Sequence, residues 1–176
     1  MLRKLQHQEI IRTSLEEIAS KPRHPIFVIV DNVRSTYNVG SIFRTSDGAL
    51  ISKLFLCGYT PYPPRPEITK TALGSTESVP WEYRPSAVEV IETLKSQGVK
   101  IAALELTTES RKHTSLTKGD FPLALVIGNE ITGIANEVLA HVDCALEIPQ
   151  FGIKQSLNVA VAYGIAVFEC MRILGE

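Results

Sequence analysis

Residues 26–58 read IFVIVDNVRSTYNVGSIFRTSDGALISKLFLCG, and this stretch decides the fold class. Residues 26–31 are an apolar run ending in Asp31, and residues 53–58 form a second such run. Continuous apolar runs of this length are typical of strands that are buried on both faces. Residues 38–50 lie between them and are expected to form a helix. A strand, a helix and a strand in this order predict a parallel sheet covered by helices.

The rest of the chain continues this alternation. We expect further strands at residues 99–104, 123–128 and 144–149, and further helices at residues 67–73, 86–97, 136–141 and 156–174. A first helix is expected over residues 3–19, where apolar side chains recur at helical spacing, namely Leu5, Ile11, Leu15 and Ile18. The sequence therefore predicts a single α/β domain at residues 26–176, preceded by a helical extension at residues 1–25.

Composition sets broad limits on function. The chain has 176 residues, of which 44% are hydrophobic and 21% charged, so it suits one ordinary soluble domain. A net charge of −1 argues mildly against nucleic acid as a partner, although a local basic patch or a dimer could still provide one. The longest apolar stretch, residues 157–174, is interrupted by Asn158, Glu169 and Arg172, and so we expect no membrane span.

The cysteines and the N-terminus bear on metal binding and location. Cys57, Cys144 and Cys170 are far apart, no C-x-x-C pair exists, and the four histidines are scattered. We therefore expect neither a metal site nor a disulfide framework. Free buried thiols suit a reducing compartment. Because the first ten residues, MLRKLQHQEI, contain no apolar signal core, we expect a cytoplasmic protein.

Ligands of open α/β sheets bind beyond the carboxyl ends of the strands, and polar residues follow several strands here. Asp31, Glu105 and Glu130 each come directly or shortly after an apolar run. The dinucleotide fingerprint G-x-G-x-x-G is absent after the first strand, and so is the phosphate-binding P-loop. A ligand at this edge is therefore not held in the common nucleotide-binding manner.

Three segments are the candidates for the site. In NVGSIFRTSDGA, residues 38–49, Asn38 can cap the following helix, and Gly40 permits a close backbone approach. This segment also carries Arg44, although an ordinary amphipathic helix with a solvent-facing arginine would explain it equally well. In VIGNEITGI, residues 126–134, a tight turn after a strand presents Glu130, which could instead only cap a helix.

The third segment is IPQFGIKQSLNVAVA, residues 148–162. A strand ends at Pro149, and a loop then leads to Ser156, a residue that commonly caps helices. Free amides at such a helix start can bind an oxygen-rich group. A buried C-terminal helix with a conventional cap is the alternative interpretation.

The three segments together resemble the motifs of the SpoU (TrmH-like) family within the SPOUT superfamily of methyltransferases. The family pattern is N-x-G-x-x-x-R, then G-x-E-x-x-G, then I-P-M-x-G-x-x-x-S-L-N-V-S-V-A. The matching residues here are Asn38, Gly40, Arg44, Gly128, Glu130, Gly133, Ile148, Pro149, Gly152, Ser156, Leu157, Asn158 and Val159. The resemblance runs from about residue 25 to the C-terminus. Gln150 replaces the usual Met, and Ala160 replaces the usual Ser.

This resemblance implies a fold, a cofactor and a reaction. The fold would be an α/β domain, mostly a parallel sheet with helices on both faces, with a trefoil knot formed by residues 121–176. The cofactor would be S-adenosylmethionine, held at Leu104, Gly128, Ile148 and Leu157. The implied reaction is transfer of its methyl group to a ribose 2′-hydroxyl of tRNA or rRNA. Arg44 would be the key catalytic group, and the catalytic set would be completed by Asn38, Glu130, Ser156 and Asn158.

The resemblance also implies partners, namely RNA and a second copy of the chain in a homodimer with mixed active sites. Candidate phosphate contacts are Arg3, Lys4, Arg12, Lys21, Arg23, His24, Arg65, Lys70, Arg111, Lys112 and Lys154. The alternatives are an RNA base methyltransferase, a non-catalytic RNA-binding homologue, and an enzyme that binds phosphorylated sugars or nucleotides. The missing Gly-rich loops disfavour the last of these.

Overall fold

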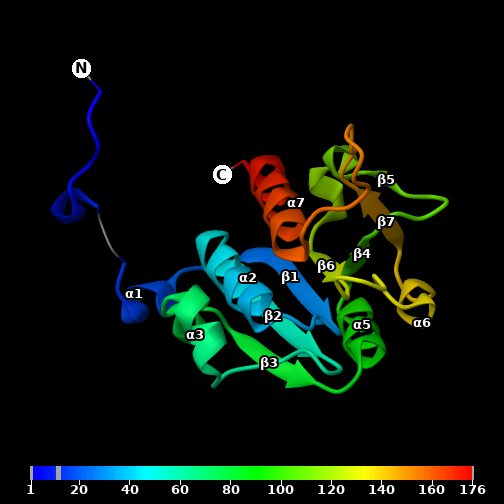
Figure 1. Cartoon of the computed structure of the whole chain (residues 1–176), viewed down its shortest axis with the longest axis horizontal. Helices are drawn as coiled ribbons and strands as arrows, with labels where there is room; N and C mark the ends of the chain where they lie inside the picture. Colours follow the sequence, from blue (N-terminus) through cyan, green and yellow to red (C-terminus); the bar gives the residue numbers. More distant parts are fainter. Residues whose placement is uncertain (1, 11–12, 176) are drawn as a thin grey trace.

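The computed structural model describes residues 2–10 and 13–175 and contains one seven-stranded sheet (Figure 1). The strand order is β3-β2-β1-β6-β4-β7-β5, and every neighbouring pair is parallel. The strands are β1 His24–Asp31, β2 Ile51–Cys57, β3 Trp81–Arg84, β4 Lys100–Leu104, β5 Arg111–Lys112, β6 Leu123–Ile127 and β7 Cys144–Glu147. The predicted parallel α/β architecture is confirmed, while β3 and β5 are strands that the sequence analysis did not predict.

Helices cover both faces of this sheet (Figure 1). The α-helices are α1 Leu15–Ser20, α2 Thr36–Gly48, α3 Pro66–Ala72, α4 Ser75–Ser78, α5 Ala87–Ser96, α6 Asn136–Leu139 and α7 Val159–Leu174, and the 3-10 helices are η1 His7–Glu9, η2 His113–Ser115 and η3 Lys118–Asp120. Helices α2, α3 and α7 pack on one face, and α5 and α6 pack on the other. This arrangement explains why the central strands are apolar throughout.

Strand β1 illustrates how two cores form from one run of residues. Val28 and Val30 point into the core shared with α2 and α7, whereas Ile29 points into the core shared with α5. All three side chains are fully buried. A buried hydrogen bond of 2.8 Å between Ser46 Oγ of α2 and Tyr163 Oη of α7 joins the two helices within the first core. This bond helps to fix the position of α2 relative to α7.

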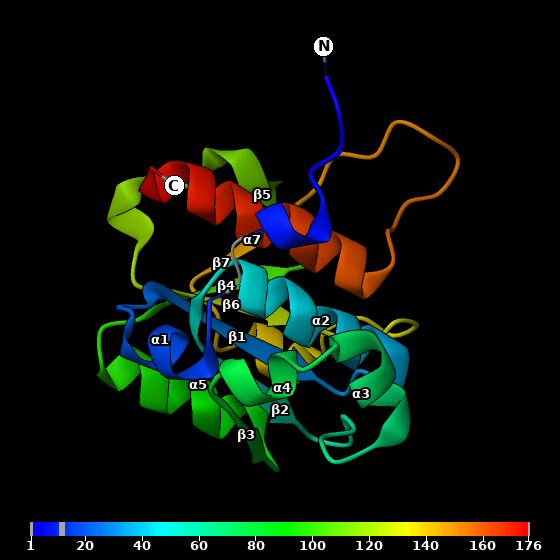
Figure 2. The ribbon, with the colours of Figure 1, turned by 90° about the vertical axis from the view of Figure 1, so that its left-hand side faces the viewer.

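The N-terminal segment differs from its prediction. Residues 2–6 are not helical, η1 spans three residues and α1 only six, while Ile11 lies outside the described residues. The predicted continuous helix over residues 3–19 is therefore wrong at its start, residues 3–6, whereas α1 confirms helical structure at residues 15–19. Its apolar side chains have no core to cover, since Leu5 and Leu15 are exposed. Short helices without tertiary packing are marginal in water, and the segment extends away from the sheet (Figures 1 and 2).

Two helices begin elsewhere than expected. Helix α2 is capped by Ser35, whose Oγ accepts from the Asn38 backbone amide at 3.3 Å, so Asn38 is not its cap. Helix α7 is capped by Asn158, whose Oδ1 accepts from the Ala160 and Val161 amides, so Ser156 is not the cap and residues 156–158 precede the helix. Figure 2 shows the loop between β7 and α7 projecting from the body.

No helix in residues 2–10 and 13–175 is long and apolar enough to cross a membrane. The strand order and the packing of α7 on the sheet agree with the fold implied by the sequence motifs. The trefoil knot itself, assigned above to residues 121–176, stays a prediction.

Candidate active site

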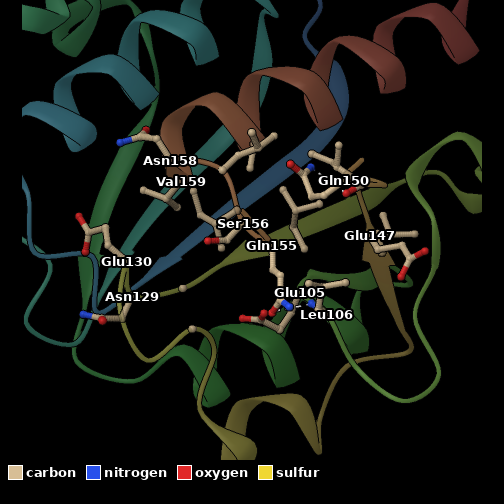
Figure 3. A pocket seen from close by; sticks show the side chains of 18 of the residues that line it. Glu105, Leu106, Asn129, Glu130, Glu147, Gln150, Gln155, Ser156, Asn158 and Val159 are labelled. Atoms are coloured by element: carbon tan, nitrogen blue, oxygen red, sulfur yellow. Dashed lines mark hydrogen bonds between the residues drawn. The ribbon is translucent and has the colours of Figure 1, made fainter. Parts of the chain in front are cut away.

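A cavity of about 250 Å³ opens beyond the carboxyl ends of β4, β6 and β7 (Figure 3). The four residues predicted to hold the cofactor all line it, namely Leu104, Gly128, Ile148 and Leu157. Leu104 ends β4, Gly128 follows β6, and Ile148 follows β7, whereas Leu157 belongs to the loop before α7. The parallel sheet therefore brings together residues that are up to 53 positions apart in the sequence, from 104 to 157.

A tight turn forms one wall of this cavity. Asn129 and Gly133 exchange backbone hydrogen bonds of 3.0 and 3.2 Å across it. A Cβ on Gly128 would come within 2.6 Å of the Gly133 carbonyl carbon and the Ile134 nitrogen. Gly133 has a φ of +68°, a conformation that favours glycine, and a Cβ there would meet the Glu105 carboxylate. Both glycines of the G-x-E-x-x-G motif are therefore required by the shape of the turn.

The cavity wall combines apolar side chains with carboxylates. Leu104, Leu146 and Ile148 contribute apolar surface, while Glu105 and Glu147 lie toward the side opposite Asn158 (Figure 3). Glu105 accepts hydrogen bonds of 3.0 Å from the Leu106 and Ile134 amides. Among the described residues that line the cavity there is no Lys, Arg or His. Such a wall favours an apolar or positively charged ligand over a phosphorylated one.

Glu130 connects three segments of the chain. Its carboxylate accepts hydrogen bonds from the Arg34 and Ser35 amides at 2.9 and 3.0 Å, and from Asn38 Nδ2 at 2.9 Å. Asn38 Oδ1 in turn accepts a hydrogen bond of 3.1 Å from Asn158 Nδ2. The structure thus brings together one residue from each sequence motif. It also excludes the alternative in which Glu130 only caps a helix.

The Glu130 carboxylate titrates below its ordinary range. Partial burial alone would raise the pKa of Glu130, but hydrogen bonds from the Arg34 amide, its own amide, Asn38 and the Ser35 amide outweigh it and lower the pKa. A carboxylate that accepts several hydrogen bonds is stabilised in its charged form. Glu130 is therefore ionised at neutral pH and serves as an acceptor.

Arg44 and Ser156 lie outside this network. Arg44 is an exposed residue of α2 that does not line the cavity, and no ion pair of the described residues includes it. Among the described residues, Glu130 and Asn158 form hydrogen bonds with Asn38 and not with Arg44. Ser156 lines the cavity and is exposed.

Asn129 is a site residue that the motif analysis missed. Its Oδ1 accepts from the Ile131 and Thr132 amides at 2.8 and 3.0 Å, and its Nδ2 donates to the Asn32 carbonyl and to Tyr59 Oη, each at 2.9 Å. The side chain therefore closes the turn that carries Glu130. Its position between the motif residues Gly128 and Glu130 was the feature of the sequence that could have identified it as a site residue.

The two departures from the family pattern are compatible with the site. Gln150 lines the cavity, and its Nε2 donates to the Ile148 carbonyl at 3.0 Å. Ala160 contributes its backbone amide to the Asn158 cap, a contact that needs no side-chain hydroxyl. Neither residue removes a group from the network of Asn38, Glu130 and Asn158.

Two of the candidate phosphate contacts have structural roles. Arg23 donates to the carbonyls of Ile51 and Ser78, and Arg111 pairs with Asp120 at 3.3 Å. Arg12 lies outside the described residues. In residues 2–10 and 13–175, no group of three or more His, Cys, Asp or Glu side chains is arranged to hold a metal ion.

Comparisons with known proteins agree with this geometry. The model of the SpoU rRNA Methylase family matches residues 25–168. A tRNA (guanosine(18)-2′-O)-methyltransferase from Aquifex aeolicus is 33% identical over 90% of this chain and 74% of its own length. The crystal structure of the A. aeolicus TrmH/SpoU tRNA modifying enzyme has a TM-score of 0.81 and 30% identity, covering 90% of this chain and 79% of that one.

A second solved structure is similar and contains a ligand. It is an AdoMet-bound rRNA methyltransferase from Sinorhizobium meliloti, with a TM-score of 0.80 and 32% identity over 86% of this chain. This chain spans 57% of that protein's length. The family model matches residues 25–168, and the three motifs, the parallel sheet and the cavity are consistent with that match. The chain therefore belongs to the SpoU rRNA methylase family.

Proposed function

We propose that this protein is an S-adenosylmethionine-dependent methyltransferase that acts on a ribose 2′-hydroxyl of tRNA or rRNA. The observation that carries the proposal is that the second and third motifs line one cavity, to which Asn38 of the first motif is joined by hydrogen bonds with Glu130 and Asn158. The named activities of the A. aeolicus and S. meliloti relatives support the same reaction class.

The cavity suits this cofactor in shape and charge. Leu104, Ile148 and Leu157 provide apolar surface for an adenine ring, and the backbone around Gly128 offers hydrogen-bonding groups. Glu105 and Glu147 give the wall a negative charge that favours a cationic ligand. When bound, S-adenosylmethionine supplies an electrophilic methyl group on a positively charged sulfur.

Arg44 is proposed to act on the RNA. A guanidinium keeps its proton at neutral pH, so it is poorly suited to act as a general base. It can instead stabilise the developing negative charge on the 2′-oxygen or hold the adjacent phosphate. Its exposure on α2, outside the cavity wall, leaves it available for such a contact.

Asn38, Glu130 and Asn158 are proposed to position the helix that carries Arg44. Glu130 holds the backbone just before α2, and Asn158 both caps α7 and donates to Asn38. These contacts connect the cavity wall to the first turn of α2. Ser156, which is exposed and lines the cavity, is proposed to contact the ribose or the cofactor.

A homodimer is the proposed assembly. Val161, Ile165 and Phe168 lie on one face of α7 and are 52%, 39% and 53% exposed. This apolar face adjoins α2, since a Cβ on Gly48 would lie 3.8 Å from Phe168 Cζ. Contiguous exposed apolar surface of this kind marks interaction sites. A second copy covering it would lie beside the helix that carries Arg44, and so both copies could contribute to one site.

Two further proposals follow from the sequence. We propose that residues 1–25 are an extension of a single catalytic domain at residues 26–176. We also propose a cytoplasmic location, which suits an RNA-modifying enzyme and the three free thiols of Cys57, Cys144 and Cys170.

The function is tested by mapping ribose methylation across total RNA of a deletion strain and its parent. We expect one or a few nucleotides of tRNA or rRNA to lose their 2′-O-methyl group and to regain it when the wild-type gene is restored. Full restoration by an Arg44→Ala variant would contradict the role proposed for Arg44. Identical methylation maps in both strains would contradict the proposed function.

A further inference from the structure

Three tyrosines with exposed side chains lie near the carboxyl ends of β2 and β3, and none of them lines the cavity. Tyr59 and Tyr62 belong to the loop between β2 and α3, and Tyr83 belongs to β3. The residues are 62%, 43% and 39% exposed, respectively. Tyr59 is more exposed than buried, and Tyr62 and Tyr83 each keep more than a third of their surface accessible, so aromatic surface is available to a ligand in this region.

Hydrogen bonds hold two of these rings in place. Tyr83 donates its hydroxyl to the Gly58 carbonyl at 3.0 Å, and Tyr59 Oη accepts from Asn129 Nδ2 at 2.9 Å. The rings of Tyr62 and Tyr83 have centroids 4.6 Å apart and planes inclined by 37°. Because the rings are fixed while much of their surface faces solvent, little side-chain entropy would be lost when a flat ligand binds.

The loop that presents the tyrosines is itself anchored. Thr60 is buried, and its hydroxyl donates to the Val30 carbonyl at 3.0 Å and accepts from the Val33 amide at 3.1 Å. The Tyr59 amide donates to Asn32 Oδ1 at 3.1 Å. The loop thus has a fixed position relative to the end of β1.

Asn129 connects the tyrosine cluster to the cavity. Its side-chain amide donates both to Tyr59 Oη and to the Asn32 carbonyl, while Asn129 itself lines the cavity (Figure 3). Tyr59 therefore lies one hydrogen bond away from the turn that carries Glu130. A polymer whose reacting group enters the cavity could place an adjoining unit on these rings.

The charges around the cluster favour a polyanion. Arg34 and Arg65 are exposed, and neither takes part in an ion pair among the described residues. Arg65 ends the loop that carries Tyr59 and Tyr62, and Arg34 follows Asn32, whose carbonyl accepts from the same Asn129 side-chain amide as Tyr59 Oη. Glu82, the carboxylate next to Tyr83, is paired with Lys53 and Arg84. Exposed aromatic rings with free cations nearby are the combination that single-stranded nucleic acids recognise.

We propose that Tyr59, Tyr62 and Tyr83 form a stacking surface for an unpaired base of the RNA substrate, near the nucleotide whose ribose enters the cavity. This inference rests on the proposed function and adds a base-binding site to it. The base stacks on the exposed ring faces, and Arg34 and Arg65 contact the adjoining phosphates. Sequence tolerance is expected, because every base has a flat face.

Tyr62→Ala is the primary test, since no side-chain hydrogen bond of Tyr62 is present among the described residues and truncation should leave the fold intact. Binding is measured with the RNA transcript that the wild type methylates. We expect Tyr62→Ala to weaken RNA binding by roughly 5-fold to 100-fold, with S-adenosylmethionine affinity and the melting temperature nearly unchanged. Tyr62→Phe keeps the ring and serves as the matched control, with wild-type affinity expected.

Removing the base from individual unpaired nucleotides of the transcript provides the second arm. At the nucleotide that stacks, an abasic position should weaken binding by the wild type and have little further effect on Tyr62→Ala. Equal RNA affinities of the wild type and Tyr62→Ala would overturn the stacking proposal, as would equal weakening by Tyr62→Phe and Tyr62→Ala. A wild type that methylates no RNA at all would instead contradict the proposed function, so the two failures are distinguishable.

Discussion

Arg44 is the residue on which the proposed chemistry depends. It is exposed on α2 and does not line the cavity that the four proposed cofactor-binding residues share. Its proposed contribution is a charge-assisted contact that forms mainly in the transition state. If this assignment is right, a change of Arg44 should lower the rate of methyl transfer to RNA without changing the affinity for S-adenosylmethionine.

We expect Arg44→Ala to reduce single-turnover methyl transfer by roughly 100-fold to 1000-fold, equivalent to about 2.7–4 kcal/mol. Arg44→Lys should also be strongly impaired, because one ammonium cannot reproduce a planar guanidinium bonded to two groups. Calorimetric affinity for S-adenosylmethionine should stay nearly unchanged in both variants, with EDTA present to exclude metal effects. Wild-type rates in Arg44→Ala would disprove the proposed role, even though the family assignment would stand.

Glu130 gives a second prediction at the residue scale. Glu130→Gln keeps the size of the side chain but turns one acceptor into a donor, which would face the Arg34 or Ser35 amide. We expect the free energy of unfolding to fall by about 1–2 kcal/mol at pH 7, together with reduced methyl transfer. The exposed residue Glu137 of α6 offers the control Glu137→Gln, for which urea denaturation should detect little change.

The pH dependence of this difference follows from the pKa of Glu130, which is lower in the folded protein than in the unfolded chain. The stabilisation is therefore fully present above the ordinary glutamate range and is lost as the pH falls through the lowered pKa. The gap between wild type and Glu130→Gln should accordingly narrow in acid. A gap that widened below pH 4 would contradict the hydrogen-bond network as described.

At the scale of elements, the turn between β6 and α6 has no room for a side chain at Gly128. An added Cβ would approach backbone atoms of Gly133 and Ile134 to 2.6–2.7 Å, so the turn would have to open. Gly128→Ala should therefore lower the melting temperature by several degrees, for a cost of about 1–3 kcal/mol, and weaken S-adenosylmethionine binding. In Gly119→Ala the new Cβ would lie 3.7 Å from Thr117 Oγ1, an ordinary contact, and this control should melt like the wild type.

Helices α2 and α7 are joined by the buried hydrogen bond between Ser46 and Tyr163. Ser46→Ala leaves the Tyr163 hydroxyl without this partner in the core and should cost about 1–3 kcal/mol of unfolding free energy. The double variant Ser46→Ala/Tyr163→Phe removes both polar groups and should recover part of that loss. Denaturation of the two single variants and the double variant gives the coupling energy, and strictly additive effects would show that the bond contributes nothing.

The sequence was sufficient to predict the strands whose side chains are buried. It was insufficient to predict the elements that form through contacts with distant parts of the chain. The apolar runs predicted β1, β2, β4, β6 and β7, because most of the side chains in these strands are buried. Strand β5 has only two residues, both basic, and β3 is half exposed, so neither produces such a run. The predicted N-terminal helix is confirmed only over α1, since Leu5 and Leu15 are exposed and do not pack into a core.

Local rules also could not decide between competing caps. Ser156 and Asn158 are both residues that commonly cap helices, and only the folded chain shows that the Asn158 side chain binds the Ala160 amide. Likewise, the motifs identified Asn38 and Glu130 as candidates, but their hydrogen bond joins residues 92 positions apart. The sequence thus predicted which residues gather at the site better than how they contact one another.

The whole molecule is proposed to act as a homodimer through the exposed apolar face of α7. Light scattering at micromolar concentration should give twice the chain mass of 19.4 kDa. Phe168→Glu places a charge in that face and should shift the measured mass toward the monomer and lower activity with it. A wild-type monomer with full activity would refute the dimer.

The central claim is that the protein methylates a ribose 2′-oxygen of RNA, and the position of the transferred methyl group tests it most directly. Purified protein would be incubated with RNA from the deletion strain and isotopically labelled S-adenosylmethionine, and the RNA would then be digested to nucleosides for mass spectrometry. We predict that the label resides on the ribose, in a 2′-O-methylated nucleoside, and that Arg44→Ala removes it. Label on a base, or no label in any RNA, would contradict the account.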